Sequence, residues 1–412
     1  MATIRPFRSV RPIENLASRV AALPYDVYNR EEALEEVIKE PLSFLKVDRA
    51  ETQFAADFNP YDAKVYEKAR DILQEMLNKG LLIKEDQRCY YVYELTMDGR
   101  SQTGIVGCAA IEDYLNNVIK KHEKTREDKE IDRTTHVDIC NAQTGPIFLA
   151  YRSQKEINDV VEVIKKATPL YDFVASDGVG HTVWKIDNAL DIETIYEGFK
   201  NVESIYIADG HHRTASAVKV GLKRREENPG YTGEEEFNFF LSVLFPHDQL
   251  MILDYNRVVK DLNGLNKEEF LSEVAKAFLV EEKGSEPYKP SEKATFGMYL
   301  EGVWYKLRAK PEMRSEDPVG GLDIAFLQNH LFVSVLNIKD IRTDRRIDFV
   351  AGIRGLKELE KRVNHDMKVA FSLYPTSISE LFDVSDADKL MPPKSTWFEP
   401  KLRSGLFIHE LE

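Results

Sequence analysis

Apolar residues along the chain follow two spacings, one typical of helices and the other typical of strands. The helical spacing predicts amphipathic helices, which cover residues 30–39, 60–80, 157–164, 192–199 and 325–332. Short apolar runs predict strands, which cover residues 89–97, 103–111, 146–151, 205–208, 237–245, 251–259 and 369–374. Turn-forming pairs predict hairpins at Asp98-Gly99, Asp177-Gly178 and Glu301-Gly302. The elements do not alternate as strict strand–helix–strand units, so we expect an α+β fold rather than a doubly wound sheet.

Polar and helix-breaking residues indicate where elements begin and end. Asn59-Pro60 predicts the start of the second helix, with Asn59 as its cap, and Gly80 predicts its end. Residues 281–293, rich in Glu, Lys, Ser, Pro and Gly, are the strongest linker candidate. We expect a core domain over residues 1–255 and a C-terminal α+β region over residues 256–412 that packs back on it.

The stretch Asp209-Gly210-His211-His212-Arg213 is the most informative part of the chain. It joins the strand predicted at 205–208 to a helix-forming stretch that Gly221 is expected to end. A strand that turns sharply into a helix presents free backbone N–H groups and the positive end of the helix dipole, which suit a phosphate. Gly210 lets a ligand approach the backbone closely, because it has no Cβ. The plain alternative is that Asp209 only caps the helix while the histidines pack or face water.

The side chains of this turn suit phosphate chemistry better than zinc chemistry. Arg213 could fork onto phosphate oxygens, and His211 or His212 could hydrogen-bond the transferring group or relay a proton. Asp209 could hold a histidine tautomer or reach Mg²⁺ through water. His211 and His212 are adjacent, so on a helix they cannot share one face as zinc ligands do.

A second polar cluster lies upstream, at His122-Glu123-Lys124-Thr125-Arg126 and Arg133. A carboxylate beside a histidine, arginines and a hydroxyl supplies the base, the charge neutralisation and the positioning that phosphoryl transfer needs. Glu123 is the candidate general base. The alternative is a solvated charge run.

Two further segments carry weaker signals. The charged block at 340–348 could clamp an anion, but a salt-bridged surface hairpin explains it better. In Pro392-Pro393-Lys394-Ser395-Thr396, Lys394 could reach a phosphate, although a plain turn explains the segment equally well.

Composition limits the classes of function. The 412 residues are 43% hydrophobic, which allows a sizeable core, and no apolar run reaches membrane-spanning length. The N-terminus lacks the apolar core of a signal peptide, and the three cysteines have no metal-ligand spacing, so we expect a cytoplasmic protein. The net charge of −14 makes nucleic acid a poor partner, whereas a small anionic ligand is compatible with it.

Several motifs together resemble one family. They are Arg5-Pro6-Phe7, Pro24-Tyr25-Asp26-Val27, His122-Glu123, Pro146-Ile147-Phe148, Asp209 to Arg213 and Met391 to Thr396. Their order resembles a widespread prokaryotic family of unknown function, domain of unknown function 1015, often labelled SpoOJ/ParA/ParB/repB-like. The turn also resembles the phosphate-binding motif of the ParB and sulfiredoxin superfamily, which includes free serine kinases. That resemblance implies a ParB/sulfiredoxin-like core with a mixed sheet.

The resemblance and the residue chemistry together lead to one expected function. We expect a nucleotide-dependent phosphotransferase or phosphatase that acts on a small metabolite such as serine or phosphoserine, with Mg²⁺ and ATP or ADP as cofactors. The expected catalytic residues are Glu123, His122, Asp209 and His212. The expected phosphate- or nucleotide-binding residues are Gly210, His211, Arg213, Thr214, Arg126, Arg133 and Lys394.

Two alternatives to this function stay open at this point. A ParB-like module could respond to a nucleotide without turnover, although the chain is acidic and has no convincing helix-turn-helix segment. A sulfiredoxin-like enzyme would need a thiol near the turn, where no cysteine stands. The substrate, the direction of transfer and the oligomeric state, including a homo-oligomer, are not fixed by the sequence.

Overall fold

The computed structural model describes every residue, Met1–Glu412, and its chain divides into two compact units. The first unit holds Met1–Leu250 and Pro400–Glu412, and the second holds Met251–Glu399. The sequence placed residues 400–412 in the C-terminal region, but in the structure they belong to the first unit, because β21 (His409–Glu410) pairs with β7 (Ala142–Gln143). None of the helices combines the length and the apolar character needed to span a bilayer.

The first unit is built on a nine-stranded mixed sheet, which bears out the expected α+β class. Its strand order is β6-β11-β8-β12-β5-β4-β10-β9, and β1 pairs with β5 at one side. The pairs β6–β11 and β8–β12 are parallel and the others are antiparallel. The strands are β1 (Ile4–Arg5), β4 (Tyr90–Met97), β5 (Arg100–Ala110), β6 (Ile119–Lys120), β8 (Ile147–Tyr151), β9 (Tyr171–Val174), β10 (Gly180–Ile186), β11 (Ile205–Asp209) and β12 (Phe239–Pro246). The small strands β2 (Val10–Pro12) and β3 (Leu82–Lys84) form a separate pair.

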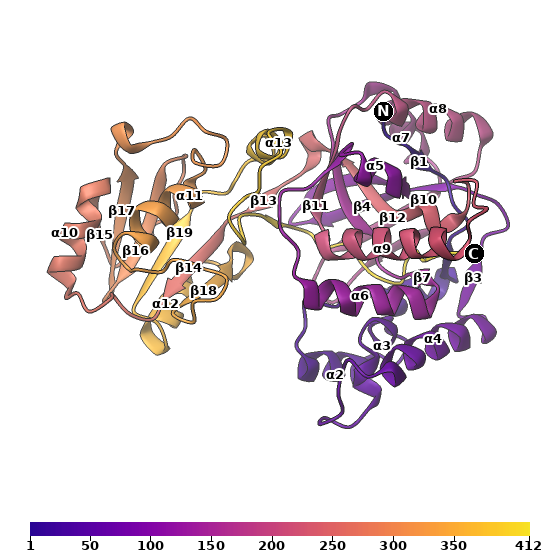
Figure 1. Ribbon diagram of the computed structural model, residues 1–412, viewed down its shortest axis with the longest axis horizontal. Coiled ribbons are helices and arrows are strands. Elements are labelled where there is room, and N and C mark those ends of the chain that lie inside the picture. The colour runs from indigo at the N-terminus through magenta and orange to yellow at the C-terminus, as the bar shows by residue number, and fades with distance from the viewer. The chain divides into compact units, whose positions relative to one another are not determined.

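Helices cover this sheet and form a second layer beyond it (Figure 1). They are α1 (Ala17–Val20), α2 (Arg30–Lys39), α3 (Leu45–Asp48), α4 (Ala63–Asn78), α5 (Ile111–Leu115), α6 (Glu127–Cys140), α7 (Lys155–Ile164), α8 (Ala189–Lys200) and α9 (His211–Glu227). Helix α9 packs on β8 and β12 on one side and on α6 on the other, and α6 in turn packs on α4. The two helices α6 and α9 therefore bring the sequence around residue 130 beside the turn that starts α9.

Two apolar cores hold the first unit together. One joins the strands to α7, α8 and α9, and Leu149, Phe199 and Phe240 lie within it at 0% exposure. The other joins α1 to α4 with Cys140 at the end of α6. The long strands β4, β5 and β12 are buried over most of their length, as a sheet covered on both faces requires.

The second unit is a six-stranded antiparallel sheet with helices and one small strand pair. The sheet order is β15-β17-β16-β19-β14-β18. Its strands are β14 (Tyr255–Val259), β15 (Phe278–Gly284), β16 (Thr295–Leu300), β17 (Val303–Ala309), β18 (Ile347–Ala351) and β19 (Val369–Leu373), and β13 (Ile252–Leu253) pairs with β20 (Trp397–Phe398). Its helices are α10 (Lys267–Ala277), α11 (Asp323–Leu327), which continues as a π-helix over Gln328–Val333, α12 (Leu356–His365) and α13 (Ile378–Asp386).

Most predicted elements are present, and the three hairpin turns are confirmed. Three details were wrong. Helix α4 begins at Ala63 and is capped by the side chain of Asp62, not by Asn59. Gly221 does not end α9 but lies inside it, where a Cβ would stand 2.6 Å from the Phe237 carbonyl oxygen, so a close packing contact explains this glycine. Residues 281–293 are not a linker between domains, because β15 covers their first part and they lie within the second unit.

Candidate functional site

The turn between β11 and α9 requires a glycine. β11 ends at Asp209 and α9 begins at His211, so Gly210 is the single residue between them, with φ 98° and ψ 31°. This left-handed conformation is readily adopted by glycine and strained for other residues. A Cβ at Gly210 would also lie 3.1 Å from Nε and Nη2 of Arg213. The Arg213 guanidinium therefore folds back over the turn that carries it.

Two cations surround the carboxylate of Asp209. Nη1 of Arg213 donates to the Pro146 carbonyl oxygen at 2.6 Å, and Nη2 lies 3.8 Å from Oδ2 of Asp209. Nζ of Lys401 donates to the same Oδ2 at 3.2 Å. Burial disfavours the charged carboxylate, but Lys401 and Arg213 more than offset burial and hold the pKa of Asp209 well below its usual range.

His122, in the segment after β6, and His211, the first residue of α9, form a buried pair. Their rings meet edge to face with centroids 4.5 Å apart. The backbone N–H of His122 donates to Nε2 of His211 at 3.5 Å, and Nδ1 of His211 lies 4.0 Å from Oε2 of Glu123. In this arrangement the proton of neutral His211 sits on Nδ1, facing Glu123. Glu123 is therefore coupled to the turn through His211.

Burial keeps both of these histidines neutral. It lowers the pKa of His122 to about 4, although the charge of Asp209 and a hydrogen bond with the Ile207 backbone act in the other direction. It also lowers the pKa of His211 well below its usual value. Nδ1 of His122 is buried and makes no hydrogen bond.

His212 is held by the start of α6. The backbone N–H of Arg126 donates to Nε2 of His212 at 3.0 Å, so the neutral ring carries its proton on Nδ1 and can donate only from there. Burial lowers the pKa of His212, while the carboxylates of Asp26 and Glu130 act against that shift. The guanidinium of Arg126 pairs instead with Asp128 on the surface. Arg126 thus meets the turn through its backbone, not through its charge.

Arg133 lies on α6 in a buried position beside the turn. Its guanidinium pairs with Asp132 at 3.0 Å and lies over the ring of Tyr25, 4.1 Å from the ring centroid. Burial raises the pKa of Tyr25 to about 12. Tyr25 and Arg133 line a narrow cavity of about 30 Å³ together with Arg213. The structure therefore brings Arg133 close to Arg213.

Two predicted residues have other partners. Thr214 is buried, and its hydroxyl donates to the Gly210 carbonyl oxygen at 3.1 Å. Lys394 belongs to the second unit, where its Nζ lies 5.7 Å from the ring centroid of Tyr255 and its carbonyl oxygen accepts from Arg257. Within the charged block at 340–348, Arg342 pairs with Asp340, as a salt-bridged surface segment would. The expected hairpin was wrong, because the block leads into β18, which pairs with β14.

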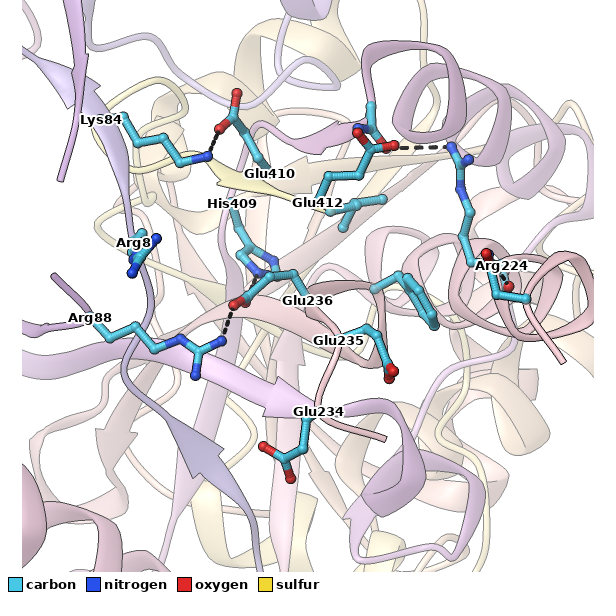
Figure 2. A pocket seen from close by; sticks show the side chains of 14 residues that line it. Arg8, Lys84, Arg88, Arg224, Glu234, Glu235, Glu236, His409, Glu410 and Glu412 are labelled. Carbon is cyan, nitrogen blue, oxygen red and sulfur yellow. Dashed lines mark hydrogen bonds and ion pairs between the residues drawn. The ribbon is translucent and has the colours of Figure 1, made fainter. Parts of the chain in front are cut away.

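A cavity of about 780 Å³, shown in Figure 2, has no residue of the turn in its wall. It includes Arg224, thirteen residues after His211 along α9 and so roughly 20 Å away at 1.5 Å per residue. Its charged groups largely satisfy one another, since Lys84 pairs with Glu410 and Arg88 pairs with Glu236. Size alone does not make it the candidate site.

Three residues near the turn carried no predicted role. Tyr25 and Asp26 lie in a motif that marked the family resemblance, which was the available signal, but nothing local gave them a function. Lys401 reaches Asp209 from the far end of the chain, and no local pattern predicts a contact over 192 residues.

Comparisons with known proteins point to one family and to several distant structures. A family described as "Protein of unknown function (DUF1015)" matches residues 4–325. No curated protein matches the sequence. A variant of a free serine kinase in complex with AMP is 13% identical with a TM-score of 0.37, and the match covers 74% of this chain and 92% of that chain.

Two other solved structures are similarly distant. A conserved hypothetical protein from Pyrococcus furiosus is 13% identical with a TM-score of 0.34, and the match covers 74% of this chain and 94% of that one. SbnI with a C-terminal truncation, from Staphylococcus aureus, is 10% identical with a TM-score of 0.37, and the match covers 71% and 82% of the two chains.

Proposed function

The chain belongs to the DUF1015 family of proteins of unknown function, and we propose that it transfers a phosphoryl group between a nucleotide and a small metabolite. The observation that carries this proposal is the β11–α9 turn, where a left-handed glycine, a helix N-terminus and a largely buried arginine meet. We also propose that the mixed sheet of the first unit is a ParB/sulfiredoxin-like core. Serine and phosphoserine are the first substrates to test.

The backbone of the turn suits a phosphate. The first N–H groups of a helix have no acceptor within the helix, and the dipole of a helix of 17 residues places positive potential at the same end. Gly210 has no side chain to keep an anion away from these groups. A phosphate held there would receive backbone hydrogen bonds from the start of α9.

The side chains add positive charge to this end of the helix. Arg213 and Lys401 are two cations around the carboxylate of Asp209, and Arg213 belongs to the turn itself. The Pro146 carbonyl fixes one amino group of Arg213, and the guanidinium is thus positioned before a ligand arrives. We propose that Arg213 stabilises the charge on the transferring phosphoryl group.

The proposed reaction in the kinase direction uses Glu123 as the base. The metabolite hydroxyl oxygen bonds to the terminal phosphorus of the nucleotide while the bond from that phosphorus to the bridging oxygen breaks. Glu123 takes the hydroxyl proton, and the shortened nucleotide leaves with the electron pair of the broken bond. His212, whose proton sits on Nδ1, donates a hydrogen bond to the phosphoryl oxygens.

Mg²⁺ would enter this reaction with the nucleotide, held mainly by phosphate oxygens and water. The chain holds no group of three or more His, Cys, Asp or Glu side chains arranged to bind a metal ion. The residues of the chain itself bind the phosphate, stabilise its charge and take up the proton.

The test is turnover by the purified full-length protein. Labelled serine or phosphoserine is incubated with a panel of nucleoside di- and triphosphates and Mg²⁺, and transfer is followed in both directions. Arg213→Ala and His212→Ala should each lower the rate at least ~100-fold, as loss of an oxyanion-stabilising donor does. Arg342→Ala is the matched control, because Arg342 is exposed and pairs only locally with Asp340.

Each result of this experiment tests a different part of the proposal. Absence of turnover with every nucleotide in both directions would remove serine and phosphoserine as substrates. Nucleotide binding without turnover of a wider metabolite set would favour the ParB-like binding module. Unchanged rates in the Arg213→Ala and His212→Ala proteins would remove these residues from the site.

A further inference from the structure

A second cavity, of about 320 Å³, lies in the first unit and shares part of its wall with the narrow cavity that Arg213 lines. Four tyrosines line it, namely Tyr25, Tyr28, Tyr61 and Tyr66. They come from the loop before α2, from the segment before α4 and from α4 itself. Its volume lies near the lower end of the range of roughly 300–1,000 Å³ for small-molecule pockets, which suits part of a nucleotide rather than a long polyphosphate ligand.

The cavity adjoins the narrow cavity that Arg213 of the β11–α9 turn lines. Tyr25 and Arg133 line both this cavity and the narrow cavity that contains Arg213. The stacked pair of Tyr25 and Arg133 is thus part of the wall of both cavities. A ligand that places its phosphate on the turn would have this aromatic cavity as its neighbour.

The charges of the cavity wall balance. Four cationic side chains, Arg30, Arg49, Lys129 and Arg133, face four carboxylates, Asp26, Asp48, Glu51 and Asp132. Two of the arginines are occupied by the protein itself, since Arg30 donates to the Ala55 carbonyl oxygen and Arg49 to the Tyr28 carbonyl oxygen. A wall without net formal charge does not attract phosphate, whereas the turn does.

The tyrosine rings offer stacking surfaces. The Tyr61 side chain is 55% exposed, Tyr28 is half-buried and one face of Tyr25 is covered by Arg133. Aromatic side chains stack on nucleobases of any sequence because every base presents a π-face. The hydroxyl and carboxylate groups around the rings can pair with the polar edge of a base and with a ribose.

We infer that this cavity holds the nucleoside of the nucleotide whose phosphates lie on the β11–α9 turn. The inference rests on the proposed function, because it assigns the remaining part of the same ligand. In this arrangement the start of α9 binds the phosphates, and the tyrosine cavity binds the base and the sugar.

The experiment compares ATP and ADP with inorganic tripolyphosphate, which has the phosphate chain but no nucleoside. Calorimetric titration of the full-length protein should give tighter binding of a nucleotide than of tripolyphosphate. Tyr61→Ala should weaken nucleotide binding about 10-fold, within the cost of losing one base–aromatic stack, and leave tripolyphosphate affinity unchanged. Arg213→Ala should weaken both ligands. Tyr231→Ala is the matched control, because Tyr231 is 40% exposed and lies beyond the far end of α9.

The results distinguish this inference from the proposed function. If tripolyphosphate binds and Arg213→Ala abolishes that binding, but Tyr61→Ala and Tyr28→Ala bind nucleotides as the wild type does, the phosphate site stands and the nucleoside cavity is wrong. An equal loss of both ligands in Tyr61→Ala would also overturn it. If the wild type binds neither nucleotide nor tripolyphosphate, both the proposed function and this inference fail.

Discussion

Replacing Gly210 with alanine perturbs the site at its tightest point. The new methyl group would meet Nε, Nη2 and Cζ of Arg213 at 3.1 to 3.2 Å, and the backbone would keep φ near 98° only under strain. Because the neighbour is the end of a flexible side chain, the guanidinium can move off the turn at little cost to the fold. We therefore expect a folded protein in which Arg213 no longer lies over the turn.

Two separate magnitudes follow from this geometry. The left-handed backbone should cost about 1–2 kcal/mol of folding free energy, the usual range for strain of this kind. Displacement of Arg213 should remove a hydrogen bond between charged groups, worth about 1.5–3 kcal/mol, and so weaken phosphate binding about 10- to 100-fold. Stability and affinity should thus both fall, for different reasons.

Gly99→Ala isolates the first effect. Gly99 has φ +78°, but no atom lies within 4 Å of the Cβ that alanine would add. Thermal unfolding should show a similar loss of stability in both variants, whereas titration with tripolyphosphate should show weaker binding in Gly210→Ala alone. If Gly210→Ala binds tripolyphosphate as tightly as the wild type and Gly99→Ala do, the phosphate does not lie against this turn.

Three further predictions test the groups around the turn. His122→Gln should remove much of the acid sensitivity of folding. The pKa of His122 is 6.5 in the unfolded chain and about 4 in the fold, so its contribution to stability is complete above pH 6.5 and about 3 kcal/mol is lost as the pH falls towards 4. Denaturant titrations from pH 7 to 4 should therefore show a smaller loss of unfolding free energy for the variant than for the wild type. Glu123→Gln should lower kcat at least ~100-fold with little change in KM if Glu123 is the base, whereas a raised KM with unchanged kcat would point to a binding role. Lys401→Met should weaken tripolyphosphate binding about 10-fold by removing one cation beside Asp209, and unchanged affinity would exclude Lys401 from the site.

Local signals were enough to predict most elements of the fold. Asp98-Gly99 and Glu301-Gly302 turn as predicted, because their left-handed conformations depend only on residues in the turn itself. Gly221 was misleading because its role depends on a residue distant in the sequence. Its lack of a side chain makes room for the Phe237 carbonyl, and no local pattern around residue 221 indicates that contact. Residues 281–293 were misjudged because the charged end of an edge strand and the loop that follows it have the composition of a linker.

In the candidate site, too, contacts between residues distant in the sequence could not be predicted. The sequence predicted the segments of His122 and His211 separately, and the structure brings their rings to 4.5 Å. It could not predict that the Arg126 guanidinium turns to Asp128 while its backbone holds His212, since only packing of α6 on α9 determines that. The contact of Lys401 with Asp209 likewise depends on the return of residues 400–412 to the first unit.

The net charge of −14 and a phosphate site are compatible only for a small ligand. An anion at the site is in direct contact with Arg213, Lys401 and the N-terminal start of α9. Surface charges farther away are screened beyond about 8–10 Å at physiological salt. A nucleic acid would extend far past the turn and meet acidic surface along its backbone. A nucleotide has three phosphates at most beside the turn, and its remaining part is uncharged. The charge distribution of the chain thus selects short phosphate ligands, and binding should persist at salt concentrations that would release a polymer.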